Sequence, residues 1–252
     1  VFAGIYPGEG EDYANLKDAL EKLQLNDASL VFEPETSTAL NFGFRVGFLG
    51  MFHMEIIQER LEREYDLDII VTAPSVEYEV LMRSGEVLRI DSPADLPPEG
   101  DIEEIREPWM NVEIFTPTEF YGTVMELSTK RRATFLSQDY PAPNRVQLNF
   151  EMPLSELIVD FFDQLKSRTR GYASLDYQVA DYRRDELVKL EILVNEEPID
   201  ALATIVHKDD AYHKGQALVS KLKDLIPRQL FTVPIQTSAS GRVISRATAK
   251  AI

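Results

Sequence analysis

The fold prediction starts from residues Asn41 to Pro74, NFGFRVGFLGMFHMEIIQERLEREYDLDIIVTAP. Every second residue from Phe42 to Phe48 is apolar, which predicts a strand with one buried face. A helix is predicted from Met51 to Tyr65, because its apolar residues recur at helical spacing. Ile69 to Val71 then forms a returning strand. The stretch is therefore predicted to be a strand, a helix and a strand joined by short turns.

The residues before this stretch supply the rest of a first domain. They predict, in order, strand Val1–Tyr6, helix Asp12–Leu23, strand Leu30–Glu33 and a turn at Pro34–Ser37. The order β-α-β-β-α-β is that of the ferredoxin-like split arrangement. We therefore expect two helices on one face of a four-stranded antiparallel sheet.

Gly47, Gly50 and His53 mark the turn between the strand and the helix of the opening stretch. We expect this turn at the same end of the domain as the turn Tyr6–Gly10, facing a neighbouring domain or a partner. Glycine would permit a positive φ and a close approach there. His53 is expected to pack or hydrogen-bond at the helix start. Catalysis with Glu55 is disfavoured, because residues two apart on a helix do not face each other.

A second domain follows a connector. The connector, Ser75–Pro108, predicts a hairpin of Val76–Leu81 and Val87–Ile90 and then a loop rich in Pro and acid, DSPADLPPEG. The same order of elements then repeats. It comprises strand Trp109–Phe115, helix Glu119–Thr129, strands Arg132–Gln138 and Arg145–Glu151, helix Leu154–Ser167 and strand Ala173–Ala180.

The remaining residues predict a smaller C-terminal domain. Its elements are strands Leu187–Val194 and Ala201–His207, a helix from Asp209 or Asp210 to Leu225, strand Phe231–Thr237, a loop at Ser238–Gly241 and a final helix from Val243. We therefore predict an α+β protein with domains at 1–74, 75–184 and 185–252. The first two are ferredoxin-like with antiparallel sheets, and the third is a small α+β domain.

Composition and length set the outer bounds of the function. The chain has 252 residues, of which 44% are hydrophobic and 27% charged, as in an ordinary globular protein. No apolar run approaches the roughly 18 residues of a membrane-spanning helix, and no signal peptide is present. The absence of cysteine excludes disulfides and thiolate metal sites. Because the chain starts at Val1 and stops at Ile252 within the predicted helix, we expect it to be a piece of a longer protein.

The charge is distributed unevenly along the chain. The net charge is −17, yet His207 to Ile252 carries eight Lys and Arg against three Asp and Glu, a net of +5. The rest carries 18 against 40, a net of −22. This pattern is typical of local contact with a polyanion, but it also fits a basic helix face that balances an acidic body.

Two basic clusters follow the helices predicted in the second domain. Their members are Lys130, Arg131, Arg132, Lys166, Arg168 and Arg170. We expect both helices to end at one tip, where the six cations would meet and contact phosphate. The helix dipole alone also favours such cations, by about 0.3–1 kcal/mol each.

Four segments carry a resemblance to a known family. They are LNDASLVFEPETSTAL, GFRVGFLGMFHMEIIQERLEREYDLDIIVTAP, DFFDQLKSRTRGYASLDYQV and DLIPRQLFTVPIQ. Together they closely resemble the LepA family of translational GTPases, also called elongation factor 4. Gly50, His53, Glu55 and Ile56 resemble elongation factor G more loosely. The resemblance implies that 1–74 is similar to the family's third domain, 75–184 to the fifth domain of elongation factor G, and 185–252 to a truncated LepA-type C-terminal domain.

The resemblance also implies a function and partners. It implies a ribosome-binding part of a factor that reverses or remobilises translocation in a GTP-dependent way and affects translational fidelity. We predict that the two basic clusters contact ribosomal RNA or protein. We predict that transfer RNA is contacted by Lys208, Lys214, Lys221, Lys223, Arg228, Arg242 and Arg246. Lys250 is a further cation of this domain. A cytoplasmic monomer is implied, with peripheral association at the bacterial inner membrane as a second location, and an organellar source stays open.

No nucleotide-binding motif is present. The chain has no GxxxxGK[ST] phosphate loop, no Asn-Lys-x-Asp and no DxxG, which supply the phosphate cradle and the metal contacts of GTP hydrolysis. We therefore expect no enzyme activity and no cofactor in this chain, with GTP and Mg bound by the family's GTPase domain. We also expect no metal site, because His53, His207 and His213 lack ligand spacing. The alternative function is a regulatory protein that binds a small ligand between paired ferredoxin-like domains.

Overall fold

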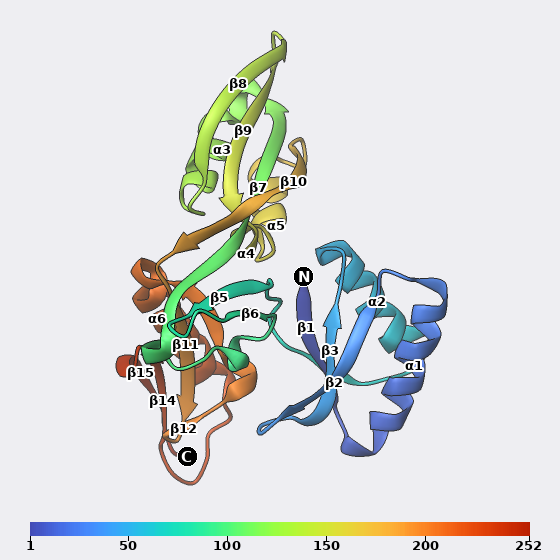
Figure 1. Ribbon diagram of the computed structural model, residues 1–252, viewed down its shortest axis with the longest axis vertical. Helices are drawn as coiled ribbons and strands as arrows, with labels where there is room; N and C mark the ends of the chain where they lie inside the picture. Colours follow the sequence, from blue (N-terminus) through green and yellow to red (C-terminus); the bar gives the residue numbers. More distant parts are fainter.

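The computed structural model describes residues 1–252 and contains three separate antiparallel sheets (Figure 1). The second ferredoxin-like domain forms one end of the molecule. The first domain and the C-terminal domain lie side by side at the other end. No helix is both long and apolar enough to cross a membrane.

The first domain has the predicted ferredoxin-like topology. Its elements are β1 (Phe2–Pro7), η1 (Gly10–Asp12), α1 (Tyr13–Asn26), β2 (Val31–Ser37), β3 (Asn41–Gly47), α2 (Met51–Arg63) and β4 (Ile69–Val71). The strand order is β2-β3-β1-β4. Leu16, Leu20 and Leu23 of α1 and Ile57 and Leu61 of α2 form the core with the sheet, which confirms the helical spacing on which the prediction rested.

Two expectations for the first domain were wrong. Residues Pro34 to Ser37 continue β2 instead of forming a turn, because they pair with β3 as far as Asn41. The turns at Tyr6–Gly10 and Gly47–Gly50 lie at opposite ends of the sheet. The reason is that β1 and β3 are antiparallel, so Gly47 is opposite Phe2 and not opposite the end of β1.

The second domain repeats the topology with a longer first strand. Its elements are β7 (Ile102–Pro117), η4 (Thr118–Phe120), α3 (Tyr121–Thr129), β8 (Thr134–Ala142), β9 (Arg145–Pro153), α4 (Leu154–Leu157), α5 (Phe161–Arg168) and β10 (Ser174–Asp185). Strands β8, β9, β7 and β10 are neighbours in this order. The ferredoxin-like prediction is therefore confirmed for this domain too.

The connector joins the sheet of the second domain. It contains the predicted hairpin, β5 (Tyr78–Met82) and β6 (Val87–Ile90), and two short turns in the Pro-rich loop, η2 (Pro93–Asp95) and η3 (Glu99–Asp101). Strand β5 pairs with the first part of β7, which begins at Ile102 and not at Trp109. The hairpin therefore extends the sheet instead of standing apart from it.

The single helix predicted at Leu154–Ser167 is broken into α4 and α5. Asp160, between them, has a left-handed φ of 50°. Ile158 packs against the connector hairpin and the C-terminal domain, whereas Phe161 packs into the core of the second domain. Residues three apart on one straight helix point to the same side. The turn at Asp160 lets these two side chains enter different cores.

The C-terminal domain contains β11 (Leu187–Val194), β12 (Glu197–Pro198), η5 (Asp200–Leu202), β13 (Thr204–His207), η6 (Lys208–Asp210), α6 (Ala211–Leu225), β14 (Val233–Ala239) and β15 (Arg242–Ala249). The final helix predicted from Val243 was wrong, because these residues form β15. Ser245, Ala247 and Ala249 lie opposite Thr237, Ile235 and Val233 of β14. This pairing gives a short, ambiguous sequence its strand conformation.

Candidate functional site

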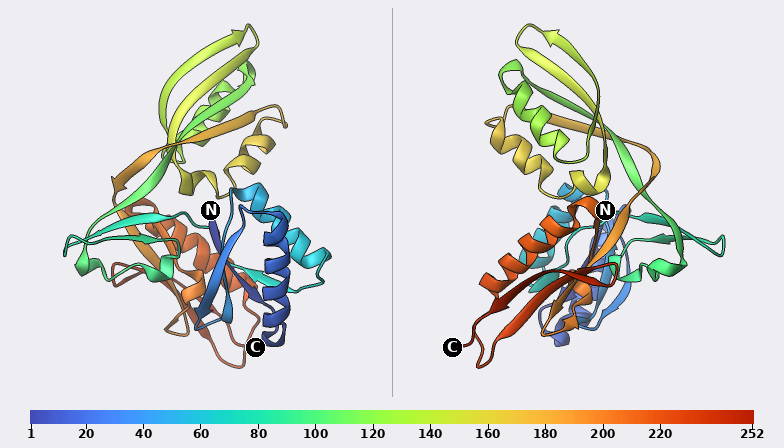
Figure 2. Two further views of the ribbon diagram at one scale, coloured as in Figure 1. Left: turned by 45° about the vertical axis from the view of Figure 1, so that its right-hand side comes forward. Right: turned by 90° about the vertical axis from the view of Figure 1, so that its left-hand side faces the viewer.

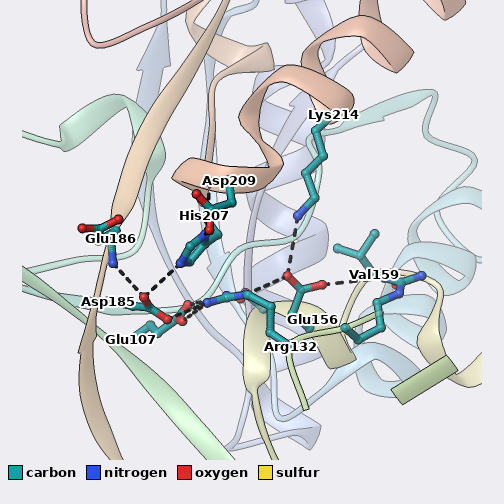
Figure 3. A network of polar contacts seen from close by, with 11 residues as sticks. Glu107, Arg132, Glu156, Val159, Asp185, Glu186, His207, Asp209 and Lys214 are labelled. Atoms are coloured by element: carbon teal, nitrogen blue, oxygen red, sulfur yellow. Dashed lines mark hydrogen bonds and ion pairs between the residues drawn. The ribbon is translucent and has the colours of Figure 1, made fainter. Parts of the chain in front are cut away.

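Six side chains from the second and C-terminal domains meet in one network, which we call the ionic junction (Figure 3). They are Glu107 of β7, Arg132 of the turn after α3, Glu156 of α4, Asp185 of β10, His207 of β13 and Lys214 of α6. The junction lies where the second domain meets the C-terminal domain.

Arg132 lies at the centre of the ionic junction. Its guanidinium donates to both carboxylate oxygens of Glu107, at 2.7 and 3.2 Å. It also donates to Asp185 at 3.0 Å and to Glu156 at 3.2 Å. The planar fork of arginine suits such shared carboxylate contacts. One side chain therefore ties together β7, α4 and β10.

The ion pair between Glu107 and Arg132 is important for the fold because it is buried. Glu107 is only 1% exposed, and its burial raises the pKa of its carboxyl group above the ordinary value. Burial also opposes the charge of Arg132, but hydrogen bonds and charge from Glu107 and Glu156 outweigh burial and raise the pKa of Arg132. Loss of Arg132 would leave a buried carboxylate without its main partner.

His207 and Lys214 connect the junction to the C-terminal domain. The Nε2 atom of His207 lies 3.0 Å from Asp185, and Nδ1 accepts the backbone N–H of Asp209 at 3.2 Å. Lys214 lies 3.6 Å from Glu156. Since both nitrogens of His207 are engaged, neither is free to act as a general base. The arrangement therefore suits domain docking.

The neighbours of Arg132 in the first basic cluster are also paired with acidic or carbonyl groups. Lys130 lies 2.6 Å from Glu126, one helical turn earlier. Arg131 donates to the carbonyl of Val159 at 2.9 Å and to the carboxylate of Asp160. All three cations of this cluster therefore have partners within the second domain.

The second basic cluster, Lys166, Arg168 and Arg170, lies at the opposite end of the second domain from the first cluster, Lys130 to Arg132. The expectation that both clusters share one tip was therefore wrong. Arg132 contacts Glu107, in the first half of β7. Arg170 lies just before β10, whose first residue, Ser174, is opposite Phe115 near the other end of β7. Eight residues of strand separate Glu107 from Phe115, or about 26 Å. The reason is that α3 and α5 run antiparallel in this topology, so their ends point in opposite directions.

The members of the second basic cluster make weaker contacts. Lys166 donates to the carbonyl of Gly171 at 3.3 Å, and Arg168 donates to Gln164 at 3.2 Å. Arg170 is exposed and has a left-handed φ of 52°. This cluster keeps its charge without a carboxylate partner.

Most other cations of the C-terminal domain remain accessible. Seven are exposed and form no ion pair within the chain, whereas Lys214 is paired with Glu156 and the half-buried Lys189 of β11 with Glu191. The seven, which we call the C-terminal cations, are Lys208, Lys221, Lys223, Arg228, Arg242, Arg246 and Lys250. Most lie on or beside α6 and the edge strand β15, which pack against each other.

Gly47, Gly50 and His53 form a close-packed turn. The Nε2 atom of His53 lies 2.7 Å from Asp27, and Nδ1 accepts the N–H of Leu49 at 3.0 Å. Gly50 has an extended φ of −177°, so the expected positive φ was wrong. A Cβ on Gly50 would lie 3.1 Å from the Tyr177 hydroxyl of the second domain. Close approach explains this glycine better than backbone conformation.

A second polar contact joins the first domain to the C-terminal domain. Asp200 accepts hydrogen bonds from the Ser37 hydroxyl at 2.7 Å and from the Thr38 N–H at 2.9 Å. Burial opposes the charge of Asp200, but these hydrogen bonds outweigh it and lower its pKa below the ordinary value. We call this contact the Asp200 latch.

Sequence reasoning did not single out the carboxylates of these contacts. Glu107, Glu156, Asp185 and Asp200 carry no local motif, and their partners lie far away in the chain. Glu107 gave no signal either, because it falls in the charged end of the predicted connector, before the predicted strand at Trp109. A buried acid on a strand points to a basic partner but does not say which one.

One cavity, of about 510 Å³, does not lie between the two ferredoxin-like sheets. It lies between the Pro-rich loop of the connector and strands β7, β10 and β11, and its lining includes Pro98, Glu104, Arg184, Lys189 and Ser240. The chain contains no group of three or more His, Cys, Asp or Glu side chains arranged to hold a metal ion.

Comparisons with known proteins show where this architecture occurs. Residues 104–193 match the family profile of the elongation factor G C-terminus, and residues 194–252 match that of the GTP-binding protein LepA C-terminus. The whole chain is 57% identical to elongation factor 4 of Desulfitobacterium hafniense and covers 42% of it. It is 55% identical to elongation factor 4 of Lacticaseibacillus casei, of which it covers 41%.

Among solved structures, a crystal structure of a Thermus thermophilus protein has the same fold over 73% of this chain and 40% of its own length. The TM-score is 0.51 and the sequence identity is 15%. The chain spans about two fifths of the length of the curated relatives that it matches. On the family profiles and these relatives, the chain belongs to the elongation factor 4 (LepA) family and corresponds to the C-terminal part of its members.

Proposed function

We propose that this chain is the ribosome-contacting, non-catalytic part of its translation factor and that the C-terminal cations bind transfer RNA or ribosomal RNA. The observation that carries the proposal is the state of these cations. All seven C-terminal cations are exposed and have no ion-pair partner within the chain, although the net charge of the chain is −17. Exposed, unneutralised Lys and Arg side chains are the groups that bind phosphate and release counterions.

The basic clusters of the second domain take different parts in this proposal. Lys130, Arg131 and Arg132 are engaged in ion pairs, so we do not assign them to RNA; Arg132 belongs to the ionic junction, and the other two stabilise the second domain. Arg168 and Arg170 are exposed, and the half-buried Lys166 has no carboxylate partner, so we retain all three as contacts to ribosomal RNA. The ionic junction and the Asp200 latch would fix the orientation of the C-terminal domain, so that its cations reach the RNA at a set angle.

The activity of the whole factor belongs to the same proposal. We place GTP and Mg binding in a GTPase domain outside this chain, since the sequence has no phosphate loop. In this view the factor acts on translocation in the cytoplasm, and this chain supplies contacts that favour one ribosomal state. The relatives named elongation factor 4 support a role in translation.

The proposal is tested by sedimentation of this chain with purified ribosomes at several salt concentrations. The test variant carries Lys221→Ala, Lys223→Ala, Arg242→Ala and Arg246→Ala. We expect weaker binding and a log–log salt slope that flattens by about 3, because each phosphate contact contributes about 0.7–0.9. The matched control removes Lys17, Lys22, Arg63 and Arg83, which lie in the first domain and the connector hairpin.

Two results would contradict the proposal. One is a wild-type chain that does not sediment with ribosomes at any salt concentration. The other is an equal loss of binding in the test and control variants. That result would indicate that the ribosome attracts any positive charge of the chain, without a defined binding site. A thermal-shift screen with amino acids and nucleotides covers the alternative of a small-molecule regulator, which would be stabilised by its ligand.

A further inference from the structure

The sheet of the second domain has one face that no helix covers. Helices α3 and α5 lie on the same side of this sheet (Figure 2). Met110, Val112 and Ile114 of β7 are buried beneath the helices, so the residues between them point to the other side. We call that other side the open face. It includes Asn111 and Glu113 of β7, Asp139 of β8, Asn149 of β9, and Asp176 and Gln178 of β10.

The open face carries uncompensated negative charge. Of its two cations, Arg183 is used internally: it lies 2.9 Å from Glu151 and 2.8 Å from Asp181 and covers the ring of Trp109 at 4.8 Å. Arg145, the first residue of β9 and on the same face as Asn149, is exposed and unpaired and offsets one negative charge. Glu113, Asp139 and Asp176 have no ion-pair partner in the chain, and all three are exposed.

Two of these carboxylates are placed unfavourably for the fold itself. Asp176 of β10 lies directly opposite Glu113 of β7 in the register of the two strands. Like charges in opposite cross-strand positions destabilise a sheet. A cation placed between Asp176 and Glu113 would remove this repulsion.

The amides beside these carboxylates form an ordered set of hydrogen-bonding groups. Gln147 donates to Asn149 at 3.0 Å, and Asn149 donates to Ser137 at 2.9 Å and to Asp139 at 3.4 Å. Asn111 and Gln178, which lie opposite each other, are exposed and make no side-chain hydrogen bond within the chain. Their amide groups can serve peptide N–H and C=O groups of a bound chain.

We propose that the open face is a docking surface for a Lys- or Arg-rich polypeptide segment that lies across β10, β7 and β9. Single-stranded RNA often binds the open sheet of a four-stranded α/β domain, by stacking on exposed aromatic rings. Here Arg183 already covers Trp109, and the carboxylates would repel phosphate. The charge therefore favours a cationic polypeptide. The inference does not depend on the C-terminal cations or on ribosome binding.

The experiment measures the affinity of this chain for a short fluorescein-labelled peptide of alternating arginine and glycine, by fluorescence anisotropy at low salt. The test variant is Glu113→Gln with Asp176→Asn. Its matched control, Glu11→Gln with Asp18→Asn, removes the same charge from exposed positions of the first domain. We expect the test variant to bind about fivefold more weakly, as for two lost surface charge contacts, and the control to bind like the wild type.

The Tm of the test variant separates this effect from unfolding. It is expected to equal or exceed that of the wild type, because the repulsion between the opposed carboxylates is gone. A lower Tm would overturn the argument from repulsion. Absence of peptide binding, or an equal loss in test and control variants, would overturn the proposal. The proposal would also be overturned if a labelled oligouridine bound the wild type and the test variant abolished that binding, because this result would identify RNA as the partner.

Discussion

At the scale of single residues, Arg132 shows how placement decides what a cation does. It belongs to a run of three basic residues, Lys130 to Arg132, that resembles a phosphate-binding cluster in sequence. In the folded chain it is surrounded by the carboxylates of Glu107, Glu156 and Asp185. Its charge stabilises the fold and is not available to a nucleic acid.

Substitution of Arg132 is predicted to be severe. We expect Arg132→Ala to lower the free energy of unfolding by about 3–5 kcal/mol, because it leaves the buried Glu107 without its bidentate partner. The measurement is urea unfolding followed by circular dichroism. Lys130→Ala, two residues earlier, is the control and should change stability little, since its ion pair is exposed. Equal effects of the two substitutions would contradict the role given to the ionic junction.

At the scale of elements, α6 and β15 show how closely the C-terminal domain is packed. Gly215 of α6 faces Thr237 of β14 and Ser245 of β15, whose hydroxyl groups hydrogen-bond to each other. A Cβ on Gly215 would lie 2.6 Å from Thr237 Oγ1 and 3.2 Å from Ser245 Oγ. The helix can approach the sheet this closely because glycine has no side chain.

Two glycine substitutions are predicted to act in opposite directions. Gly215→Ala should destabilise the chain by about 1–3 kcal/mol, because the overpacking outweighs the better helix propensity of alanine. Gly122→Ala in α3 should stabilise it by about 0.5–1 kcal/mol, since a Cβ at that position meets no atom within 4 Å. Thermal unfolding of both variants provides the comparison. Stabilisation by Gly215→Ala would show that α6 does not pack as closely as described.

At the scale of the whole molecule, polar contacts and one apolar cluster hold three domains together. The ionic junction joins the second domain to the C-terminal domain, and the Asp200 latch joins the C-terminal domain to the first. Between them, an apolar cluster unites the connector hairpin, the second domain and the C-terminal domain; it includes Val80, Ile105, Ile158, Leu187 and Ile205. The domains therefore have a defined relative orientation.

The Asp200 latch is predicted to make this orientation sensitive to acid. Its hydrogen bonds lower the folded-state pKa of Asp200 below the ordinary value of 3.8. A lowered pKa means that the contribution to stability is present above that ordinary value and is lost as the pH falls through the folded value. We expect Asp200→Asn to lower the free energy of unfolding near neutral pH. In acid, we expect the free energies of unfolding of the variant and the wild type to differ less.

The measurement is urea unfolding of both proteins across this acidic range. Hydrogen exchange at the β2–β3 turn would report opening of the latch directly. Asp18→Asn, at an exposed position of α1 without a hydrogen-bond partner, is the control. If the difference in the free energy of unfolding between Asp200→Asn and the wild type stays constant with pH, the prediction is contradicted.

Local sequence patterns were sufficient for the family resemblance, for the order of strands and helices in the first domain, and for the ferredoxin-like topology of the first two domains. Alternating apolar residues from Phe44 to Phe48 and helical spacing in α2 depend mainly on which face of an element is buried, so they can be read locally. The predicted single buried face of β3 was only partly right, because Phe42 is 64% exposed and Arg45, on the opposite face, is buried. Local patterns failed where two conformations bury a segment equally well. Val243 to Ala249 became a strand because β14 offered a partner, and the helix after Leu154 broke because Ile158 and Phe161 belong to different cores.

Which charges are available to a partner depends on contacts between residues that are far apart in the chain. Arg132 finds Glu156 at a distance of 24 residues along the chain and Asp185 at 53, and Asp200 finds Ser37 at 163. No local pattern in the sequence specifies such pairs. The antiparallel course of α3 and α5 also separates two basic clusters that look equivalent in the sequence. Charge is set by residue type, but its accessibility is set by long-range neighbours, and these exist only in the folded chain.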